Sequence, residues 1–130
     1  MHTTSIQIRF NDADPMGHIN NAVIIEYFDL AKDLFFTSRG LPPTDGDFTL
    51  IVVHLEADFR QQILRHHPIH VTTDVEKIGN KSLTLLQQVV NSDTGAICAQ
   101  CRTVLAGYRH STASSEVIPD EVRGRFALPA

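Results

Sequence analysis

Two carboxylates, a histidine and several turn-forming residues lie close together in the segment from Arg9 to Asn21. Asp14 is followed by Pro15, a pair that favours a turn, and Gly17 permits backbone angles that other residues resist. An apolar run begins directly after the segment, so a helix capped by one of two adjacent asparagines is expected there. A carboxylate can activate water or attack a carbonyl carbon, and free N–H groups in the first turn of a helix can stabilise the resulting oxyanion. The segment therefore has the residue types needed for hydrolysis at a carbonyl group.

Asp14 is the carboxylate to which this chemistry is assigned. Asp12 would point to the same side if a strand continued that far, but it can also act as an Asx residue that stabilises the turn. Glu26 lies in the expected helix and belongs more naturally to its polar stripe. Glu56 lies on an expected strand and could enter the pocket from a second subunit. Without any catalytic role, the same segment reads as a capped connection between a strand and a helix.

The apolar run after Asn21 predicts a long helix that is buried on most sides. Its apolar residues occupy nearly all directions around a helical wheel and leave a narrow polar stripe of Glu26, Asp29, Lys32 and Asp33. The apolar positions are Ala22, Val23, Ile24, Ile25, Tyr27, Phe28, Leu30, Ala31, Leu34, Phe35 and Phe36. Such a helix must be surrounded by protein.

The rest of the chain has the pattern of strands, and these would surround the helix. A short strand is expected to end at Arg9 and Phe10, and four longer ones follow the helix. Their expected ranges are Thr49 to Arg60, Ile69 to Ile78, Leu83 to Val90, and Ala96 to Arg109 after a hairpin turn at Asn91 to Gly95. Consecutive meandering strands after one helix predict an α+β fold with an antiparallel sheet curling around that helix. Pro119 to Phe126 is expected to form one or two helical turns.

Composition predicts one cytoplasmic domain. The chain has 130 residues, of which 42% are hydrophobic and 20% charged, enough for one core. We expect a single domain over residues 1–130, with a core from about 4 to 110 and a tail from 111 to 130. A net charge of −4 does not favour nucleic-acid binding. No segment reaches the roughly 20 apolar residues of a membrane span, and the N-terminus lacks the apolar core of a signal peptide.

Two other groups of residues have the types found in metal sites, and Cys98 and Cys101 also have the C-x-x-C spacing of redox and zinc sites. Cys98 and Cys101 are three residues apart within an expected strand, where their side chains would point to opposite faces. His66, His67 and His70 surround Pro68, which interrupts a helix, and residues four apart on a strand are about 13 Å apart. We therefore expect no metal site at either place.

The motif Asp14-Pro15-Met16-Gly17-His18-Ile19-Asn20-Asn21 and the order of the expected elements resemble the hotdog-fold acyl-CoA thioesterases. The most similar branch is typified by 4-hydroxybenzoyl-CoA thioesterase, with the acyl-CoA thioesterases associated with the Tol-Pal system beside it. The resemblance runs from about Thr4 to Arg125. Arg39 to Pro43 and Ile78 to Ser82 are also similar to segments of this family.

The resemblance implies a hotdog fold, in which a five-stranded antiparallel sheet wraps around a long central helix. It also implies a homodimer or homotetramer with active sites at the subunit interface. The catalytic carboxylate would be Asp14, and the backbone N–H of Asn21 would bind the thioester carbonyl. Gly17 and His18 would line the substrate site. Ile24 stands where many relatives of this type carry Tyr. The resemblance implies no metal and no cofactor.

The implied substrate is an acyl thioester of CoA or of an acyl carrier protein, cleaved to a free acid and a thiol. The acyl group would lie in an apolar slot between the helix and the interface, and the CoA phosphates would lie outside it. Lys81, Arg102 and Arg109 are the predicted phosphate partners. Two alternatives remain open: a non-hydrolytic hotdog protein that binds acyl thioesters, and a hotdog dehydratase, for which His18 is a weak match.

Overall fold

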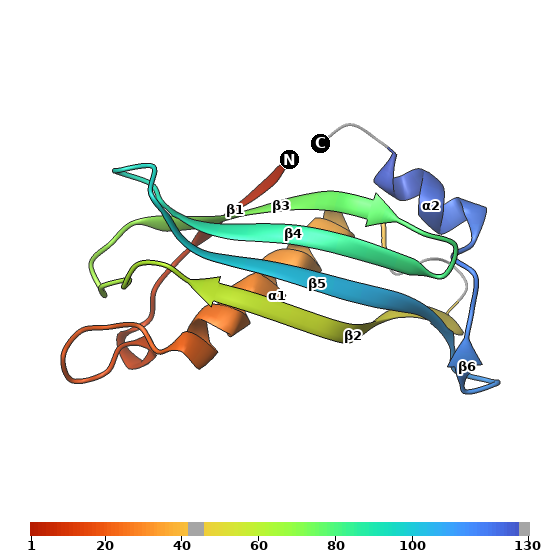
Figure 1. Cartoon of the computed structure of the whole chain (residues 1–130), viewed down its shortest axis with the longest axis horizontal. Helices are drawn as coiled ribbons and strands as arrows, with labels where there is room; N and C mark the ends of the chain where they lie inside the picture. Colours follow the sequence, from red (N-terminus) through yellow and green to blue (C-terminus); the bar gives the residue numbers. More distant parts are fainter. Residues whose placement is uncertain (42–45, 128–130) are drawn as a thin grey trace.

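The computed structural model of the chain describes residues 1–41 and 46–127. Figure 1 shows its elements in chain order. Their bounds are β1 His2–Ile6, the 3₁₀ turn η1 Phe10–Asp12, α1 Asn21–Ser38, β2 Phe48–Phe59, β3 Ile69–Ile78, β4 Ser82–Asn91, β5 Ile97–Arg109, β6 Ser114–Ser115 and α2 Asp120–Phe126. Pro42 and Pro43 of the family-like segment lie outside the described residues.

All described strands belong to one antiparallel sheet. Its order is β1-β3-β4-β5-β2, and β6 adds a two-residue pairing to the end of β5. The strands β3, β4 and β5 form a meander, while β1 and β2 are the two edges of the main path. The predicted α+β fold with an antiparallel sheet around one helix is confirmed, and β6 is an addition to the five expected strands.

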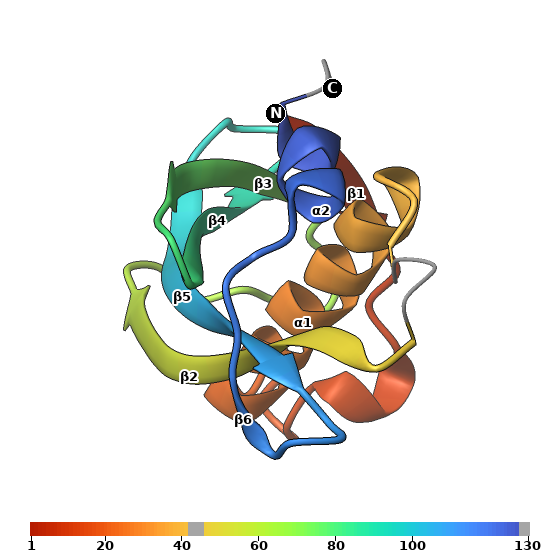
Figure 2. The same cartoon turned by 90° about the vertical axis from the view of Figure 1, so that its right-hand side faces the viewer.

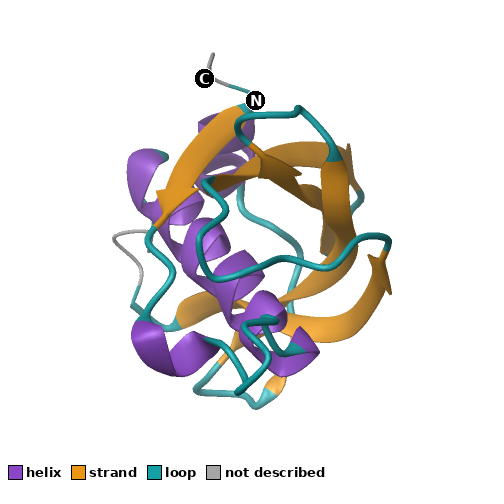
Figure 3. Cartoon of the chain, turned by 90° about the vertical axis from the view of Figure 1, so that its left-hand side faces the viewer, coloured by secondary structure: helices purple, strands orange, loops and turns teal. Residues whose placement is uncertain are grey.

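The helix α1 lies against the concave side of the curved sheet (Figures 2 and 3). Its side chains facing the sheet recur every three or four residues, as one face of a helix requires. They are Ile24, Tyr27, Phe28, Ala31 and Phe35, each at most 4% exposed. Leu30 and Leu34 are 48% and 41% exposed, however, so the expectation of a helix enclosed on most sides is wrong for a single chain.

The chain between β1 and α1 differs from the prediction of a strand that ends at Phe10. β1 ends at Ile6, and Phe10 already belongs to η1. The reason is local hydrogen bonding, because the backbone N–H of Asp12 donates to the carbonyl of Arg9 at 3.0 Å and closes a turn. The chain therefore leaves the sheet before it reaches the two carboxylates.

Cys98 and Cys101 are both buried in β5, contrary to the expectation of opposite faces. Val89 of β4 faces Ala99 while Val90 faces Ile97, so Cys98 is the extra residue of a β-bulge, which breaks the regular alternation. Both thiols are free, and burial raises the pKa of each. They are interior side chains.

The short helix α2 confirms the expected terminal turns and covers one end of the core. Val122 and Phe126 pack with Phe35 and Phe48, close to the C-terminal end of α1. Among the described helices, none is long and apolar enough to cross a membrane. Asp12 and Asp14 lie at the opposite end of α1.

Candidate active site

Asp14 lies in a tight loop that precedes α1. Its Oδ1 accepts the backbone N–H of Met16 at 2.9 Å and that of His18 at 3.0 Å. Gly17 has a φ of +82°, which favours glycine, and its N–H donates to the carbonyl of Asp14 at 2.9 Å. Oδ2 has no hydrogen-bond partner among the described residues. One carboxylate oxygen thus orients the side chain while the other stays available.

The segment after β2 holds this loop in place. The N–H of Ile19 donates to the carbonyl of Ile63, and the N–H of Arg65 donates to the carbonyl of Gly17, both at 2.9 Å. His18 and Leu64 form an antiparallel bridge between these two bonds. The loop therefore has a backbone partner of its own, independent of the main sheet.

The helix α1 begins beside this loop with a donor that is not used. Asn20 is the N-cap, and its Oδ1 accepts the N–H of Ala22 at 2.7 Å. The N–H of Ile24 donates to the carbonyl of Asn20 at 3.1 Å. The N–H of Asn21, the first helical residue, has no hydrogen-bond partner among the described residues. The N-terminus of α1 thus offers a free donor carrying the positive end of the helix dipole.

Asp14 and Asn21 border the same cavity, with a volume of about 360 Å³. Its lining consists of Asp14, His18, Ile19, Asn20, Asn21, Ile24, Phe59, Arg60, Gln61, Gln62 and Ile63. The predicted Asp14, His18 and Asn21 are thus brought together, whereas Gly17 shapes the loop without lining the cavity. The residues from the end of β2 onward were missing from the prediction, because a polar stretch between strands carries no signal of what it packs against.

Asp12 has a different role, which is to anchor the loop to α1. Its carboxylate is 3% exposed and accepts the Tyr27 hydroxyl at 2.7 Å, the Arg9 N–H at 3.0 Å and the Arg9 Nε–H at 3.0 Å. Burial alone would raise the pKa of Asp12, but the hydrogen bonds from Arg9 and Tyr27 outweigh it and hold the pKa below its ordinary value. Burial and the hydrogen bond to Asp12 also raise the pKa of Tyr27. Asp12 thus stabilises the turn, which was one of its two predicted roles, and it also links the turn to α1.

The predicted phosphate partners do not line this cavity. Arg102 Nε lies 2.9 Å from Glu76, and Arg109 Nε lies 2.6 Å from Glu116. Lys81 belongs to the β3–β4 turn, at the end of the sheet opposite the loop that precedes α1 (Figure 1). Within one chain these cations lie outside the Asp14 cavity, and their role in substrate binding stays a prediction.

Within one chain, the competing carboxylates are also outside the cavity. Glu26 lies 3.5 Å from Arg9, and Glu56 lies 3.8 Å from Arg102. Among the described residues, no group of three or more histidine, cysteine or acidic side chains is arranged to hold a metal ion. Of the histidine-rich corner, His67 Nδ1 accepts the N–H of Leu64 at 3.1 Å and His70 Nδ1 lies 2.8 Å from the Ser92 hydroxyl.

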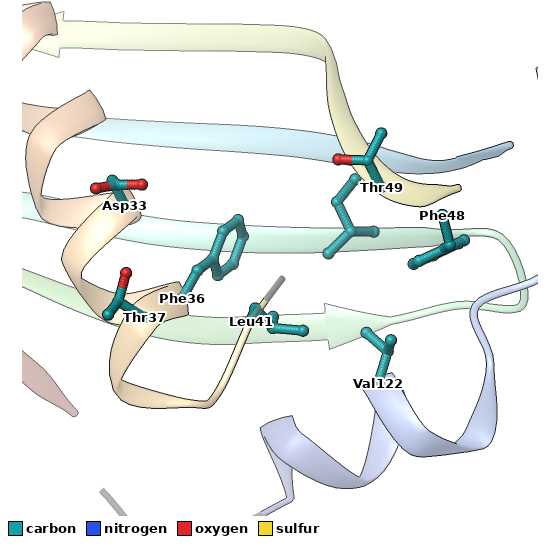
Figure 4. Close-up of a pocket in the computed structure, with 8 residues that line it drawn as sticks. Asp33, Phe36, Thr37, Leu41, Phe48, Thr49 and Val122 are labelled. Atoms are coloured by element: carbon teal, nitrogen blue, oxygen red, sulfur yellow. The ribbon is translucent and has the colours of Figure 1, made fainter. Parts of the chain in front are cut away.

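A second cavity of about 160 Å³ lies at the other end of α1. Figure 4 shows Phe36, Leu41, Phe48 and Val122 around it, with Asp33, Thr37 and Thr49 adding polar groups. The cavity is largely apolar and contains neither Asp14 nor the N-terminus of α1. It offers a binding surface but no catalytic group comparable to the first cavity.

A comparison with known protein families identifies the family of this chain. A family model described as the thioesterase-like superfamily matches residues 8–126, which include the Asp14 loop, α1 and every strand after β1. The chain belongs to the thioesterase-like superfamily. The resemblance to hotdog-fold thioesterases is thereby confirmed.

Individual proteins are similar to the chain at low sequence identity. The uncharacterized protein YsmA of Bacillus subtilis (strain 168) is 22% identical over 80 residues, which cover 62% of this chain and about half, 54%, of YsmA. A thioesterase from Thermus thermophilus, solved in complex with coenzyme A and Zn, is 28% identical with a TM-score of 0.81, covering 97% of both chains. A predicted thioesterase from Bacillus stearothermophilus is 28% identical with a TM-score of 0.82, covering 96% of this chain and 92% of its own.

The bond between Tyr27 and Asp12 should contribute measurably to stability. Tyr27→Phe removes one donor from a buried carboxylate and should lower the free energy of unfolding by about 1–3 kcal/mol at pH 7. Tyr108→Phe is the control, because the Tyr108 hydroxyl makes no hydrogen bond to a described residue. Urea unfolding measures both variants, and equal stability of the two would contradict the anchoring role.

The Asp12 carboxylate also makes the free energy of unfolding depend on pH. Because the pKa of Asp12 is lower in the folded chain than its ordinary value of 3.8, its contribution is complete above that value and is lost as the pH falls through the folded-state pKa. Asp12→Asn should therefore be less stable than wild type at pH 7, and the difference, measured by urea unfolding across the pH range, should shrink towards pH 2.

Proposed function

We propose that the chain hydrolyses acyl thioesters, with Asp14 and the N–H of Asn21 as its catalytic groups. The observation that carries this proposal is that a carboxylate with one unused oxygen and an unused helix N-terminal donor border one cavity. Hydrolysis of a thioester needs both, since water must be activated and the oxyanion that forms on the carbonyl must be stabilised. Membership of the thioesterase-like superfamily supports the same reaction.

In the proposed reaction, Asp14 acts as a general base on water. Water adds to the thioester carbonyl while its proton passes to Asp14, and the tetrahedral oxyanion accepts the N–H of Asn21. Collapse of this intermediate breaks the C–S bond and releases a carboxylic acid and a thiol, which takes up the proton. Direct attack by Asp14 through an anhydride gives the same products and is the alternative role of this residue.

CoA thioesters are the proposed substrates. The similar thioesterase from Thermus thermophilus was solved with coenzyme A, which supports this choice. The acyl group, whose identity the proposal leaves open, is expected to enter the apolar side of the cavity formed by Ile24 and Phe59.

The active form is proposed to be at least a dimer joined through β2. This strand is an edge of the main sheet, so one row of its N–H and C=O groups faces no other described strand. Val52, Val53 and Leu55 on β2 are 44%, 57% and 42% exposed, and Leu30 of α1, also exposed, lines a pocket together with Leu50 of β2. A second copy pairing with β2 about a two-fold axis would satisfy the edge and cover this apolar surface.

Such a pairing would also extend the catalytic cavity. The N-terminus of α1 lies beside Phe59 at the end of β2, and its C-terminal end lies beside Phe48 at the start. A two-fold axis through the middle of β2 would therefore bring the second cavity of the partner, the one around Phe36 and Leu41, close to Asp14. We infer that it continues the apolar slot for the acyl group that begins at Ile24 and Phe59.

Asp14→Asn should abolish thioester cleavage and leave the fold intact. Asparagine keeps an oxygen that accepts the N–H groups of Met16 and His18, so the loop should persist, but the basic carboxylate is lost. The rate should fall by about 100-fold or more. The assay is thiol release, followed with a free-thiol reagent, from a panel of short, long and aromatic acyl-CoA substrates.

Asp12→Asn provides the comparison for this variant. At a temperature where circular dichroism shows it folded, it should lose less activity than Asp14→Asn. An Asp14→Asn protein that kept more than a tenth of the wild-type rate would overturn the assignment, and a wild-type chain that released no thiol from any substrate would overturn the function.

Asn21→Ala should reduce the rate only modestly, because the backbone N–H remains and Asn20, not Asn21, caps the helix. Asn21→Pro should reduce it far more, since proline has no N–H. Proline is tolerated at the first helical position, and the extended backbone of Asn20, with ψ of 143°, suits a residue before proline. Rate constants on protein shown to be folded test the pair. Equal inactivity of the two would mean that the Asn21 side chain takes part in the chemistry.

Light scattering should give a mass of at least twice the 14.5 kDa of one chain. Val52→Lys places a charge on the β2 surface and should shift the chain towards monomer with loss of activity. Val117→Lys is a matched control, because Val117 is 43% exposed, like Val52 at 44%, but lies outside β2. A fully active wild-type monomer would contradict the proposed assembly.

A further inference from the structure

Two arginines lie on the segment between β2 and β3 that packs against the Asp14 loop, and neither was among the predicted phosphate partners. Arg60 follows directly after β2 and lines the cavity together with Asp14. Arg65 lies on the far side of the intervening turn, and its backbone N–H donates to the carbonyl of Gly17 in the Asp14 loop at 2.9 Å. The backbone N–H of Arg60 donates to the carbonyl of Cys98 at 2.8 Å and fixes the other end of this turn. Both arginines thus have a fixed backbone position next to the site.

These two guanidinium groups differ from those of Arg9, Arg102 and Arg109, which carboxylates neutralise. Arg9, Arg102 and Arg109 each lie within 3.5 Å of one or more acidic side chains. For Arg60 and Arg65, no carboxylate of the described residues lies within ion-pair distance. In a chain with a net charge of −4, two such cations on the segment between β2 and β3, one of them lining the cavity, create a local field that attracts anions.

Arg65 is also oriented by an aromatic ring. Its guanidinium carbon lies 5.4 Å from the centroid of the Phe10 ring, within the range of a cation–π contact. Phe10 is 78% exposed, so the face of its ring is accessible to the guanidinium. Stacking on the ring holds the planar guanidinium while leaving its N–H groups free for two parallel hydrogen bonds, the geometry that suits phosphate.

We propose that Arg60 and Arg65 form a phosphate-binding rim that recognises the nucleotide part of a CoA thioester. This inference rests on the proposed function, because it names the carrier of the acyl group hydrolysed at Asp14. CoA carries a diphosphate and a ribose phosphate, whereas the prosthetic group of an acyl carrier protein carries one phosphodiester. Two separate guanidinium groups, Arg60 lining the cavity and Arg65 beside the loop that carries Asp14, match several phosphates better than one.

The test compares acyl-CoA with the same acyl group on pantetheine, which has the thioester but no phosphate. Arg60→Gln and Arg65→Gln should each raise KM for acyl-CoA by about 10-fold with little change in kcat, as expected for loss of a charge-assisted hydrogen bond in the ground state. The KM for acyl-pantetheine should not change. Lys77→Gln is the charge-matched control, because Lys77 is exposed on β3 and lies outside both cavities.

A direct binding measurement keeps the test independent of catalysis. Calorimetry with free CoA should show about 10-fold weaker binding for each arginine variant, even if the wild type hydrolysed nothing. Unchanged CoA affinity and KM in the variant that combines Arg60→Gln with Arg65→Gln would overturn the proposal. A loss of CoA affinity seen only in Lys81→Gln would also overturn it. A loss seen with an acyl-carrier-protein thioester but not with acyl-CoA would also overturn it, because the rim would then serve a protein carrier.

Discussion

The buried carboxylate of Asp12 determines where the candidate site can form. It receives hydrogen bonds from Tyr27 on α1 and from Arg9 before η1, so it connects two parts of the chain that share no strand pairing. A carboxylate that is 3% exposed is costly unless it is fully hydrogen-bonded, so the connection is geometrically strict. Asp14, two residues later, is thereby held at a fixed position relative to the start of α1.

The long elements followed from sequence patterns, whereas the short connections did not. Alternating burial in β4 and β5 and the apolar run of α1 repeat over many residues, so their position and type could be predicted. The expected strand end at Phe10 failed because one backbone hydrogen bond within Arg9 to Asp12 outweighed β propensity. The bulge at Cys98 also has no repeating pattern that would reveal it in the sequence.

Within the candidate site, the motif from Asp14 to Asn21 predicted the loop and the start of α1. It did not predict the residues on the opposite side of the cavity. Asp14, His18 and Asn21 are close in sequence, so their proximity in space follows from a turn. Arg60 and Gln61 reach the same cavity only because the 61–67 segment pairs with the loop through Ile63 and Arg65. That pairing is made by backbone groups, which are common to all residue types. No pattern of side chains therefore predicts it.

The arginines illustrate why sequence alone does not show which cations are available to bind a phosphate. Arg102 and Arg109 occupy strand positions where a phosphate partner was reasonable, yet each faces a carboxylate on a neighbouring segment, Glu76 for Arg102 and Glu116 for Arg109. An ion pair already satisfies much of the electrostatic attraction that a guanidinium could offer to a phosphate. Arg60 and Arg65 lack such a neighbour among the described residues, so their charge remains available. The distinction arises from cross-strand register and turn geometry, because these decide which carboxylates come within reach of each cation. An acidic chain can therefore present a positive surface at the place where its proposed substrate enters.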